Sequence, residues 1–272
     1  MLPVLFKIGV FELHSYGVAL AISVLMGILV ARKRAPRFGV DQNTILDLAI
    51  VIMLAAIIGS RLWYVVNHLN EFRGHWFDII NPFRGEYIGI AGLSMVGGVV
   101  LAIISSAVYA WKKKLNFIKL GDVVAPVFLL GAGFQRLFGC FLNGCCFGKP
   151  TDSFLGVVFP PEAVASAHYP GIHIWPTQLF ASFLGFAGFA LIIWLGRWHS
   201  FSGYTMWQVF AYYSIDRFVV DQFRYYEPQE ILGTLGLLTI NTNHILLGGL
   251  IILSMFFWFK GWSKQRQKRT VD

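Results

Sequence analysis

The residues of this sequence best suited to chemistry lie in one stretch, from Gly131 to Gly148, which contains Arg136 and Asn143. All three cysteines of the chain also lie there: Cys140, Cys145 and Cys146. A guanidinium in an apolar segment needs a pocket or a partner, because burying an unpaired charge is costly. The glycines allow backbone or substrate to approach closely, and they disfavour a regular helix near Gly139 and Gly144. The sequence therefore predicts that this stretch forms the floor of a site.

The composition predicts an integral membrane protein. Of the 272 residues, 56% are hydrophobic and 13% are charged, and the mean hydropathy is +0.63. A soluble domain carries about 25% charged residues. The net charge is +8, but the basic residues follow the pattern of membrane loops, so no nucleic-acid partner is expected. Three clustered cysteines do not make a disulfide framework.

Seven segments are long and apolar enough to span a bilayer, which takes about 20 residues. They are 13–31, 44–68, 87–110, 120–143, 176–196, 203–224 and 243–262. The fourth and sixth are the least hydrophobic, since Arg136, Asp216, Arg217 and Asp221 interrupt them. Interrupted spans usually face a bundle interior or a water-filled cavity. We expect an all-α membrane protein with seven transmembrane helices, forming a single integral membrane domain over residues 1–272.

Lysines and arginines concentrate in alternate loops, which sets the expected orientation. Most of the 22 basic residues lie in 32–37, in 112–119, at Arg197 and in the 260–269 tail. The positive-inside rule then places the N-terminus outside and the C-terminus in the cytoplasm. The outer loop 147–175 is rich in proline and aromatic residues, and we expect it to pack as a small periplasmic cap. An interfacial aromatic belt is the alternative.

Three arginines inside predicted spans, Arg61, Arg136 and Arg217, lie at similar depth. At about 1.5 Å per residue, each is roughly 21–25 Å from the cytoplasmic end of its span. That is the outer half of a hydrocarbon core about 30 Å thick, and Tyr16 lies at similar height. One shared anionic site is the favoured interpretation, and separate snorkelling or helix-pairing arginines are the alternative.

The sixth segment carries a charged group with helical spacing. Arg217, Asp221 and Arg224 are spaced i, i+4 and i+7, so they are expected on one helix face. Two arginines and one aspartate keep a net positive charge, which suits a phosphate held bidentately. A purely structural Arg–Asp pair is the alternative.

Taken together, these motifs resemble the prolipoprotein diacylglyceryl transferase family along nearly the whole chain. Gly139–Gly148 lies on a signature of the form Gly-Arg-x-Gly-Asn-Phe-x-Asn-Gly-Glu-x-x-Gly, with Arg136 one residue further upstream than in that pattern. Weaker matches are Ser15–Gly17, Gly59–Leu62, Gly92–Gly98, Pro176–Ala181 and Arg217–Arg224. The chain departs from the family pattern where it has Cys140 for Asn, Cys145 for Glu, Val96 for His and Ala181 for Glu. A Gly-Cys-Phe-x-x-Gly-Cys-Cys signature resembles a divergent branch.

The resemblance implies transfer of diacylglyceryl from phosphatidylglycerol to the lipobox cysteine thiol of a preprolipoprotein, with release of glycerol phosphate. The implied partners are phosphatidylglycerol, the preprolipoprotein signal peptide and membrane lipids, and the implied location is the bacterial inner membrane as a multi-pass protein. No cofactor is expected, and no metal-ligand spacing is seen. The catalytic candidates are Arg136, Arg217, Asp221 and Cys145. The substrate-binding candidates are Tyr16, Arg61, Ser94, Asn143, Gly144, Gln178 and Arg224.

The proton acceptor for the substrate thiol is left open by the sequence. A thiolate is the nucleophile, so some group must take the thiol proton. Candidates are Asp221, His168, His173 and Cys145, although a loop histidine or a small cysteine more often has a packing role. Two other functions are open: a non-catalytic or re-purposed lipid-binding relative, and a membrane thiol-redox protein, for which the usual C-x-x-C spacing is missing.

Overall fold

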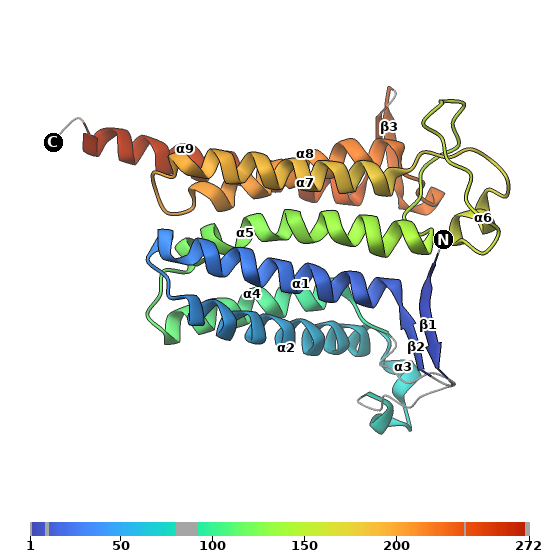
Figure 1. Cartoon of the computed structure of the whole chain (residues 1–272), viewed down its shortest axis with the longest axis horizontal. Helices are drawn as coiled ribbons and strands as arrows, with labels where there is room; N and C mark the ends of the chain where they lie inside the picture. The colour runs from blue at the N-terminus through green and yellow to red at the C-terminus, as the bar shows by residue number, and fades with distance from the viewer. Residues whose placement is uncertain (1, 9–10, 80–91, 237, 270–272) are drawn as a thin grey trace. The chain divides into compact units, whose positions relative to one another are not determined.

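The computed structural model is mostly helical (Figure 1), and it describes residues 2–8, 11–79, 92–236 and 238–269. A long helix lies at each of the seven predicted segments. They are α1 (Ser15–Arg34), α2 (Gln42–Asn67), α4 (Met95–Lys112), α5 (Phe117–Phe134), α7 (Thr177–Leu195), α8 (Tyr204–Phe223) and α9 (Thr242–Arg269). Helical segments are expected here, because a chain in lipid must satisfy its own backbone hydrogen bonds.

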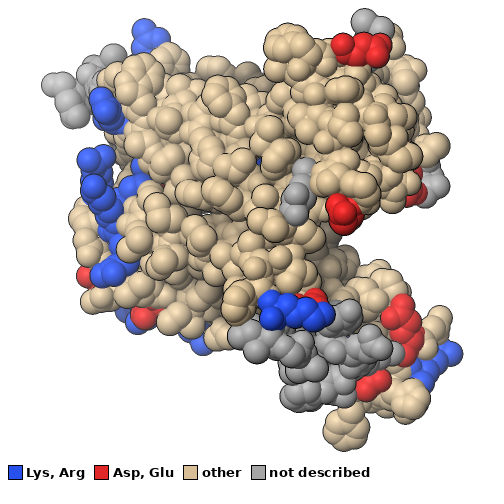
Figure 2. Space-filling view, turned by 45° about the vertical axis from the view of Figure 1, so that its right-hand side comes forward, with Lys and Arg blue, Asp and Glu red and all other residues tan. Residues whose placement is uncertain are grey.

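Six of these helical segments are long and apolar enough to cross a membrane. They are Ser15–Phe38, Gln42–Asn67, Met95–Lys112, Phe117–Phe141, Thr177–Trp198 and Thr242–Gln267. The seventh helix, α8, falls outside this set, and it carries Asp216, Arg217 and Asp221 within 20 residues. Figure 2 shows that most of the visible surface belongs to neither basic nor acidic residues, as expected of a protein surrounded by lipid.

Two predicted boundaries are wrong. The segment predicted at 87–110 forms a helix only from Met95, because Gly92 has a left-handed backbone (φ 75°) and Ser94 is extended. Residues 87–91 of that prediction lie outside the described residues. The last helix was predicted to end at residue 262, but α9 continues to Arg269.

Short elements connect the long helices. They are β1 (Val4–Ile8), β2 (Phe11–His14), η1 (Ala35–Phe38), α3 (Leu69–Phe72), η2 (Trp76–Ile79), η3 (Gln135–Phe141), α6 (Val164–His168), η4 (Gly196–Trp198), η5 (Pro228–Glu230), β3 (Ile231–Leu235) and β4 (Leu238–Asn241). Strands β1 and β2 form one two-stranded sheet, and β3 pairs antiparallel with β4 in another, with Leu235 opposite Leu238.

The chain divides into two compact units. One contains residues 1–5, 14–30 and 121–272, and the other contains residues 6–13 and 31–120. The first unit, called the α5–α9 unit below, holds the cysteines and most of the candidate site residues. The second is called the α2–α4 unit.

The α2–α4 unit is built on a close crossing of α2 and α4. A Cβ atom on Gly59 would collide with the Gly97 carbonyl oxygen, and one on Gly97 would collide with Gly59 in return. Likewise, a Cβ on Gly98 would meet the Ser60 hydroxyl. Small residues that let two backbones touch are the usual basis of helix association in lipid, where no hydrophobic drive exists between helices.

The α5–α9 unit has a small apolar core and a polar anchor. Leu129 of α5, Ile192 of α7 and Val209 of α8 pack together and are buried. The fully buried Asp122 carboxylate of α5 accepts hydrogen bonds from the backbone N–H groups at the start of α8, namely those of Gly203, Thr205 and Met206, at 2.6–2.9 Å. An anion at a helix N-terminus satisfies its free donors, so Asp122 fixes where α8 begins.

The 147–175 loop of this unit folds on a core of its own. Phe147, Phe159, Ala163, Ala165 and Ile174 are buried together. Backbone bridges tie Ile174 to Pro150 and Val157 within the loop. The loop therefore has a core of its own, and its place as a periplasmic cap stays a prediction.

Candidate functional site

A π-helical turn carries the arginine of the cysteine stretch. Residues Gln135–Phe141 continue α5 as a π-helix, η3. A π-helix closes its hydrogen bonds over five residues instead of four, so it accommodates one residue more than an α-helical turn and is frequent at functional sites. This explains why Arg136 stands one residue further from Cys140 than the signature pattern places it. The guanidinium Nη1 lies 3.7 Å from the Cys140 Sγ as a hydrogen-bond donor.

The chain then leaves the helix in a tight loop. Gly144 has φ 68°, and a Cβ there would collide with Ala163, so glycine is required. Cys146 also has a left-handed backbone, with φ 59°. That conformation costs a residue other than glycine on the order of 1–3 kcal/mol and persists only where its surroundings impose it.

Side chains from the start of α7 impose this loop conformation. The buried Thr177 hydroxyl donates to the Cys146 carbonyl at 2.7 Å, and the buried Gln178 amide donates to the Cys145 carbonyl at 2.8 Å. The N–H of Cys145 donates to the Cys140 carbonyl at 3.2 Å. The two consecutive cysteines are therefore held from α7 on one side and from η3 on the other.

The fold brings the three thiols together. The Sγ atoms of Cys140, Cys145 and Cys146 all lie within 4.8 Å of one another. The thiols of Cys140 and Cys145 hydrogen-bond to Cys146 and lower the pKa of the Cys146 thiol, and Arg224 and Arg136 lower it further. The opposite effect raises the pKa of Cys145, because its hydrogen bonds to Cys140 and Cys146 favour the protonated form.

Arg224 is the second arginine at the thiols. Its Nη2 donates to the Cys146 Sγ at 3.4 Å. The prediction that Arg224 shares the helix face of Arg217 and Asp221 is wrong, since α8 ends at Phe223 and Arg224 is extended. The reason is a strand-like pairing: the N–H of Lys149 donates to the Phe223 carbonyl, and that of Tyr225 donates to the Phe147 carbonyl.

The other two charges of the predicted face do pair. The Arg217 Nη2 lies 3.1 Å from the Asp221 Oδ1, as expected from their i, i+4 spacing. The same nitrogen donates to the Tyr226 hydroxyl at 3.0 Å. The Arg224 guanidinium covers the Tyr226 ring at 5.1 Å. Burial raises the pKa of Tyr226 to about 12, so this phenol stays protonated between the two arginines.

Asp221 has a second partner that the sequence analysis missed. His244, near the start of α9, places its Nε2 3.5 Å from the Asp221 Oδ2. The N–H of Asn241 donates to the His244 Nδ1, so in the neutral imidazole the proton sits on Nε2 and faces Asp221. Since the Asp221 carboxylate is fully buried between a guanidinium and an imidazole, it is poorly placed to accept a substrate proton.

Arg136 and Arg217 belong to one charged cluster. Both interact electrostatically with the Asp216 carboxylate, which lies next to Arg217 in α8. We call the set of Arg136, Arg217, Arg224, Asp216 and Asp221 the arginine cluster. Three guanidiniums against two carboxylates leave it net positive, and an anion site at these residues stays a prediction.

Several predicted substrate-binding residues have structural contacts. The Asn143 amide donates to the Ser15 hydroxyl at 2.9 Å and to the Gly139 carbonyl at 2.7 Å, which joins η3 to α1. Gly144 and Gln178 shape the cysteine loop, as described above. Tyr16 is 48% exposed and its ring lies beside Gly139, so it is the accessible member of this set. Direct contact with substrate stays a prediction for each of them.

Arg61 and Ser94 lie in the α2–α4 unit. The Arg61 guanidinium donates to the backbone carbonyls of Asp78, Ile79 and Gly92 at 2.7–3.1 Å. It also lies over the rings of Phe72 and Tyr64. Ser94 precedes α4, and its N–H donates to the Ser60 carbonyl. These contacts favour the helix-pairing alternative for Arg61, and a role in headgroup binding stays a prediction.

The loop histidines considered as proton acceptors lie in the 147–175 loop. His168 is exposed and packs against the rings of Phe147 and Tyr225 at 5.3 and 5.5 Å. His173 is exposed as well, and its backbone carbonyl accepts from Thr151. The ring contacts of His168 are those of a packing residue, and a role of His173 as proton acceptor stays a prediction.

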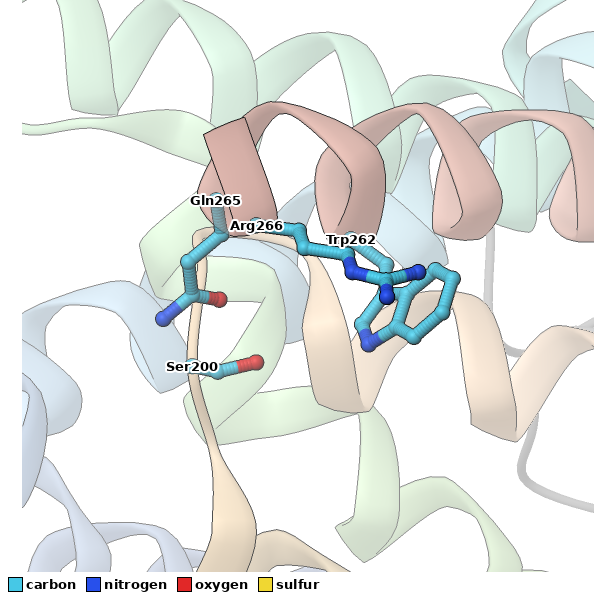
Figure 3. A pocket seen from close by; sticks show the side chains of 4 residues that line it. All are labelled: Ser200, Trp262, Gln265 and Arg266. Carbon is cyan, nitrogen blue, oxygen red and sulfur yellow. The ribbon is translucent and has the colours of Figure 1, made fainter. Parts of the chain in front are cut away.

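A cavity of about 260 Å³ lies elsewhere in this unit (Figure 3). Ser200 and three residues near the end of α9, Trp262, Gln265 and Arg266, line it. About 27 Å of helix separates Trp262 from His244, from a rise of about 1.5 Å per residue. This cavity is therefore distinct from the arginine cluster.

Known proteins of one family match most of this chain. A family model described as prolipoprotein diacylglyceryl transferase matches residues 3–260. The chain is 31% identical over 252 residues to a phosphatidylglycerol–prolipoprotein diacylglyceryl transferase of Bacillus cytotoxicus, covering 92% of this chain and 88% of that protein. It is 31% identical over 224 residues to the enzyme of that name from Clostridium tetani, covering 82% and 86%. It is 28% identical over 244 residues to the second such enzyme of Clostridium perfringens, covering 90% and 91%.

Proposed function

Because this chain belongs to the prolipoprotein diacylglyceryl transferase family, we propose that it transfers diacylglyceryl from phosphatidylglycerol to the lipobox cysteine of a preprolipoprotein. The sulfur of that cysteine becomes a thioether, and glycerol phosphate leaves. The names of the relatives supply the two substrates, and their match extends over most of both chains. The signal peptide of the preprolipoprotein and the surrounding lipids are the expected contacts.

We further propose seven crossings of the bacterial inner membrane, with the N-terminus outside and the tail in the cytoplasm. The six apolar helical segments support a multi-pass protein. Adding α8 makes the number of crossings odd, as the distribution of basic residues requires. A span that carries charged residues, such as α8, is acceptable because Arg217 pairs with Asp221, and Asp221 also lies beside His244 inside the unit.

The arginine cluster is the observation that carries the chemical proposal. Breaking the carbon–oxygen bond of phosphatidylglycerol places negative charge on the departing phosphate, and fixed cations stabilise that charge. Arg136 and Arg217 both act electrostatically on the same carboxylate, Asp216, which supports one anion site shared by the two guanidiniums. Arg217 is held by Asp221 and Tyr226, which orients its planar donors before the substrate arrives.

A transfer assay with purified protein tests the proposal. The protein is placed in vesicles that contain phosphatidylglycerol with labelled acyl chains, together with a peptide carrying a lipobox cysteine. We expect label on the peptide, linked as a thioether, and glycerol phosphate in equal amount. The same peptide with serine for cysteine should stay unlabelled. Absence of product, where the Clostridium tetani relative gives product in the same vesicles, would show that this chain does not catalyse the transfer.

A further inference from the structure

We propose that Cys140, Cys145 and Cys146 bind Zn²⁺, and that the fourth position of this ion takes the substrate cysteine thiol and holds it as a thiolate. The inference deepens the proposed function and rests on it for the identity of the thiol. The spacing of the cysteines does not predict a metal site, since one cysteine followed five residues later by an adjacent pair is not a usual ligand pattern. The fold nevertheless brings the three sulfur atoms close enough together to share one ion.

The distances fit a zinc ion. A Zn–S bond is about 2.3 Å, so two sulfurs of a tetrahedral site lie roughly 3.8 Å apart. The three Sγ atoms are within 4.8 Å of one another, so an approach of about 1 Å closes the site. Within the described residues the group comprises these three ligands. Three protein ligands with one open position are the arrangement of catalytic zinc, whereas structural zinc has four.

The charges around the sulfurs fit as well. Zn²⁺ with three thiolates carries a net charge of minus one, and minus two once a fourth thiolate binds. Two guanidiniums balance this charge: Arg136 donates to Cys140 and Arg224 donates to Cys146. Hydrogen bonds of this kind to ligand atoms orient the ligands and tune the metal.

The loop is shaped before any metal arrives. Cys146 keeps a left-handed backbone while Thr177 and Gln178 hold the carbonyls of Cys146 and Cys145. A strained residue that its surroundings hold in place points to function. Cys140 is buried, whereas Cys145 and Cys146 are only partly buried, so one side of the trio is accessible to a substrate.

Zinc would convert the substrate thiol to a thiolate, a step for which the arginine cluster offers no suitable group. The reaction needs a thiolate, and Asp221 is enclosed by Arg217 and His244. A thiol that coordinates a metal ion loses its proton outright. In the proposed step the substrate thiol binds Zn²⁺ and releases its proton to water. Its electron pair then forms the sulfur–carbon bond, and the carbon–oxygen bond breaks toward the departing phosphate. The thioether product is neutral and a weaker ligand, so it leaves the metal.

Cobalt binding tests the site without any assay of transfer. Metal-stripped, reduced full-length protein in detergent is titrated with Co²⁺, which shows intense visible bands in a tetrahedral thiolate site. We expect one Co²⁺ per chain, displaced by Zn²⁺. Loss of a group that hydrogen-bonds to a metal ligand costs about 10–100-fold in metal affinity, so Arg224→Gln should weaken Co²⁺ binding within that range. The three ligand variants should each weaken Co²⁺ binding by at least about 100-fold; they are Cys140→Ser, Cys145→Ser and Cys146→Ser. His168→Ala, a nearby potential ligand outside the trio, should bind as the parent does.

Circular dichroism and gel filtration must show that each variant remains folded. Where a cysteine variant unfolds, Arg224→Gln, which leaves all three ligands in place, decides the question. Folded, fully reduced parent protein that shows no thiolate-bound Co²⁺ overturns the proposal.

The fourth position is tested with the peptide substrate. Adding a lipobox peptide to the Co²⁺ protein should shift the visible bands, and the peptide with serine for cysteine should not. Binding of Co²⁺ without a peptide-dependent shift overturns thiol activation. Removal of zinc should abolish transfer and its return should restore it; full transfer by metal-free protein also overturns the proposal. If the zinc protein transfers nothing but still shows the shift, the metal site stands and the proposed function fails.

Discussion

At the scale of single residues, the arginines differ in how fully they are committed to the protein. Arg61 donates to three backbone carbonyls. Arg217 instead pairs with a carboxylate and a phenol, at 3.1 and 3.0 Å. A guanidinium has five donors, so these two contacts leave donors for a phosphate.

Arg217→Lys is expected to reduce the turnover of diacylglyceryl transfer on the order of 100-fold. Lysine keeps the charge but cannot contact Asp221, Tyr226 and a phosphate oxygen with one planar group, and loss of one fixed donor costs about 100–1,000-fold in turnover. The labelled-lipid assay measures the rate, and thermal unfolding checks the fold. Arg197→Lys, at an exposed position in η4, is the matched control and should behave as the parent. Parental turnover in Arg217→Lys would contradict bidentate phosphate binding.

His244→Phe is expected to destabilise the protein by about 1–3 kcal/mol, because it leaves one oxygen of the buried Asp221 without its partner. The ring contact with Phe218, at 4.9 Å, is retained by an aromatic replacement. Thermal unfolding in detergent measures the change. His173→Phe, which alters an exposed histidine, should leave the unfolding temperature as it was. Equal unfolding temperatures for the two variants would show that the His244 contact contributes nothing.

At the scale of elements, the sequence predicts the helices well and the cysteine loop poorly. Hydropathy places a long helix at each of the seven segments, because a segment in lipid must satisfy its backbone hydrogen bonds internally. The glycines at 139 and 144 correctly indicate a break in regular helix. The convergence of the three thiols depends instead on Thr177, Gln178 and Arg224, which lie 31 to 78 residues from their partners. Local spacing carries no signal for such contacts.

Gly59→Ala tests the crossing of α2 and α4. The added methyl group would collide with the Gly97 backbone, so the two helices must separate. We expect a loss of about 1–3 kcal/mol, typical of overpacking in a close-packed interior, and less folded protein in the membrane. Gly248→Ala in α9 is the control, since nothing lies within 4 Å of that position. It should be neutral or gain up to about 1 kcal/mol from helix propensity. A neutral Gly59→Ala would refute the close crossing.

At the scale of the whole molecule, orientation decides which leaflet supplies the lipid. Every residue of the arginine cluster is expected in the outer half of the membrane, so the site would draw phosphatidylglycerol and the preprolipoprotein from the outer side. The orientation of the protein in the membrane is predicted from the charges of its loops, and contacts within the fold do not test it.

Epitope tags test that orientation. One tag is inserted at Gly171 in the 147–175 loop, where no atom lies within 4 Å of the position that a Cβ would take, and another follows the C-terminus. Protease added to spheroplasts should remove the first tag and spare the second until the cells are permeabilised. Removal of the C-terminal tag from sealed spheroplasts would reverse the topology and place the arginine cluster in the inner leaflet.

The π-helical turn has a consequence for how sequences of this family are aligned. A comparison that forbids gaps within helices would pair Leu137 with the signature arginine, and Arg136 would be scored as missing. With one insertion admitted inside the helix, Arg136 regains its match and stands four residues before Cys140. Arg136 and Cys140 are then four residues apart, a spacing that puts two side chains on one face of a helix, and the guanidinium meets the sulfur there. Relatives that carry the same three cysteines should therefore carry the same extra residue, and an indel of one would mark the branch.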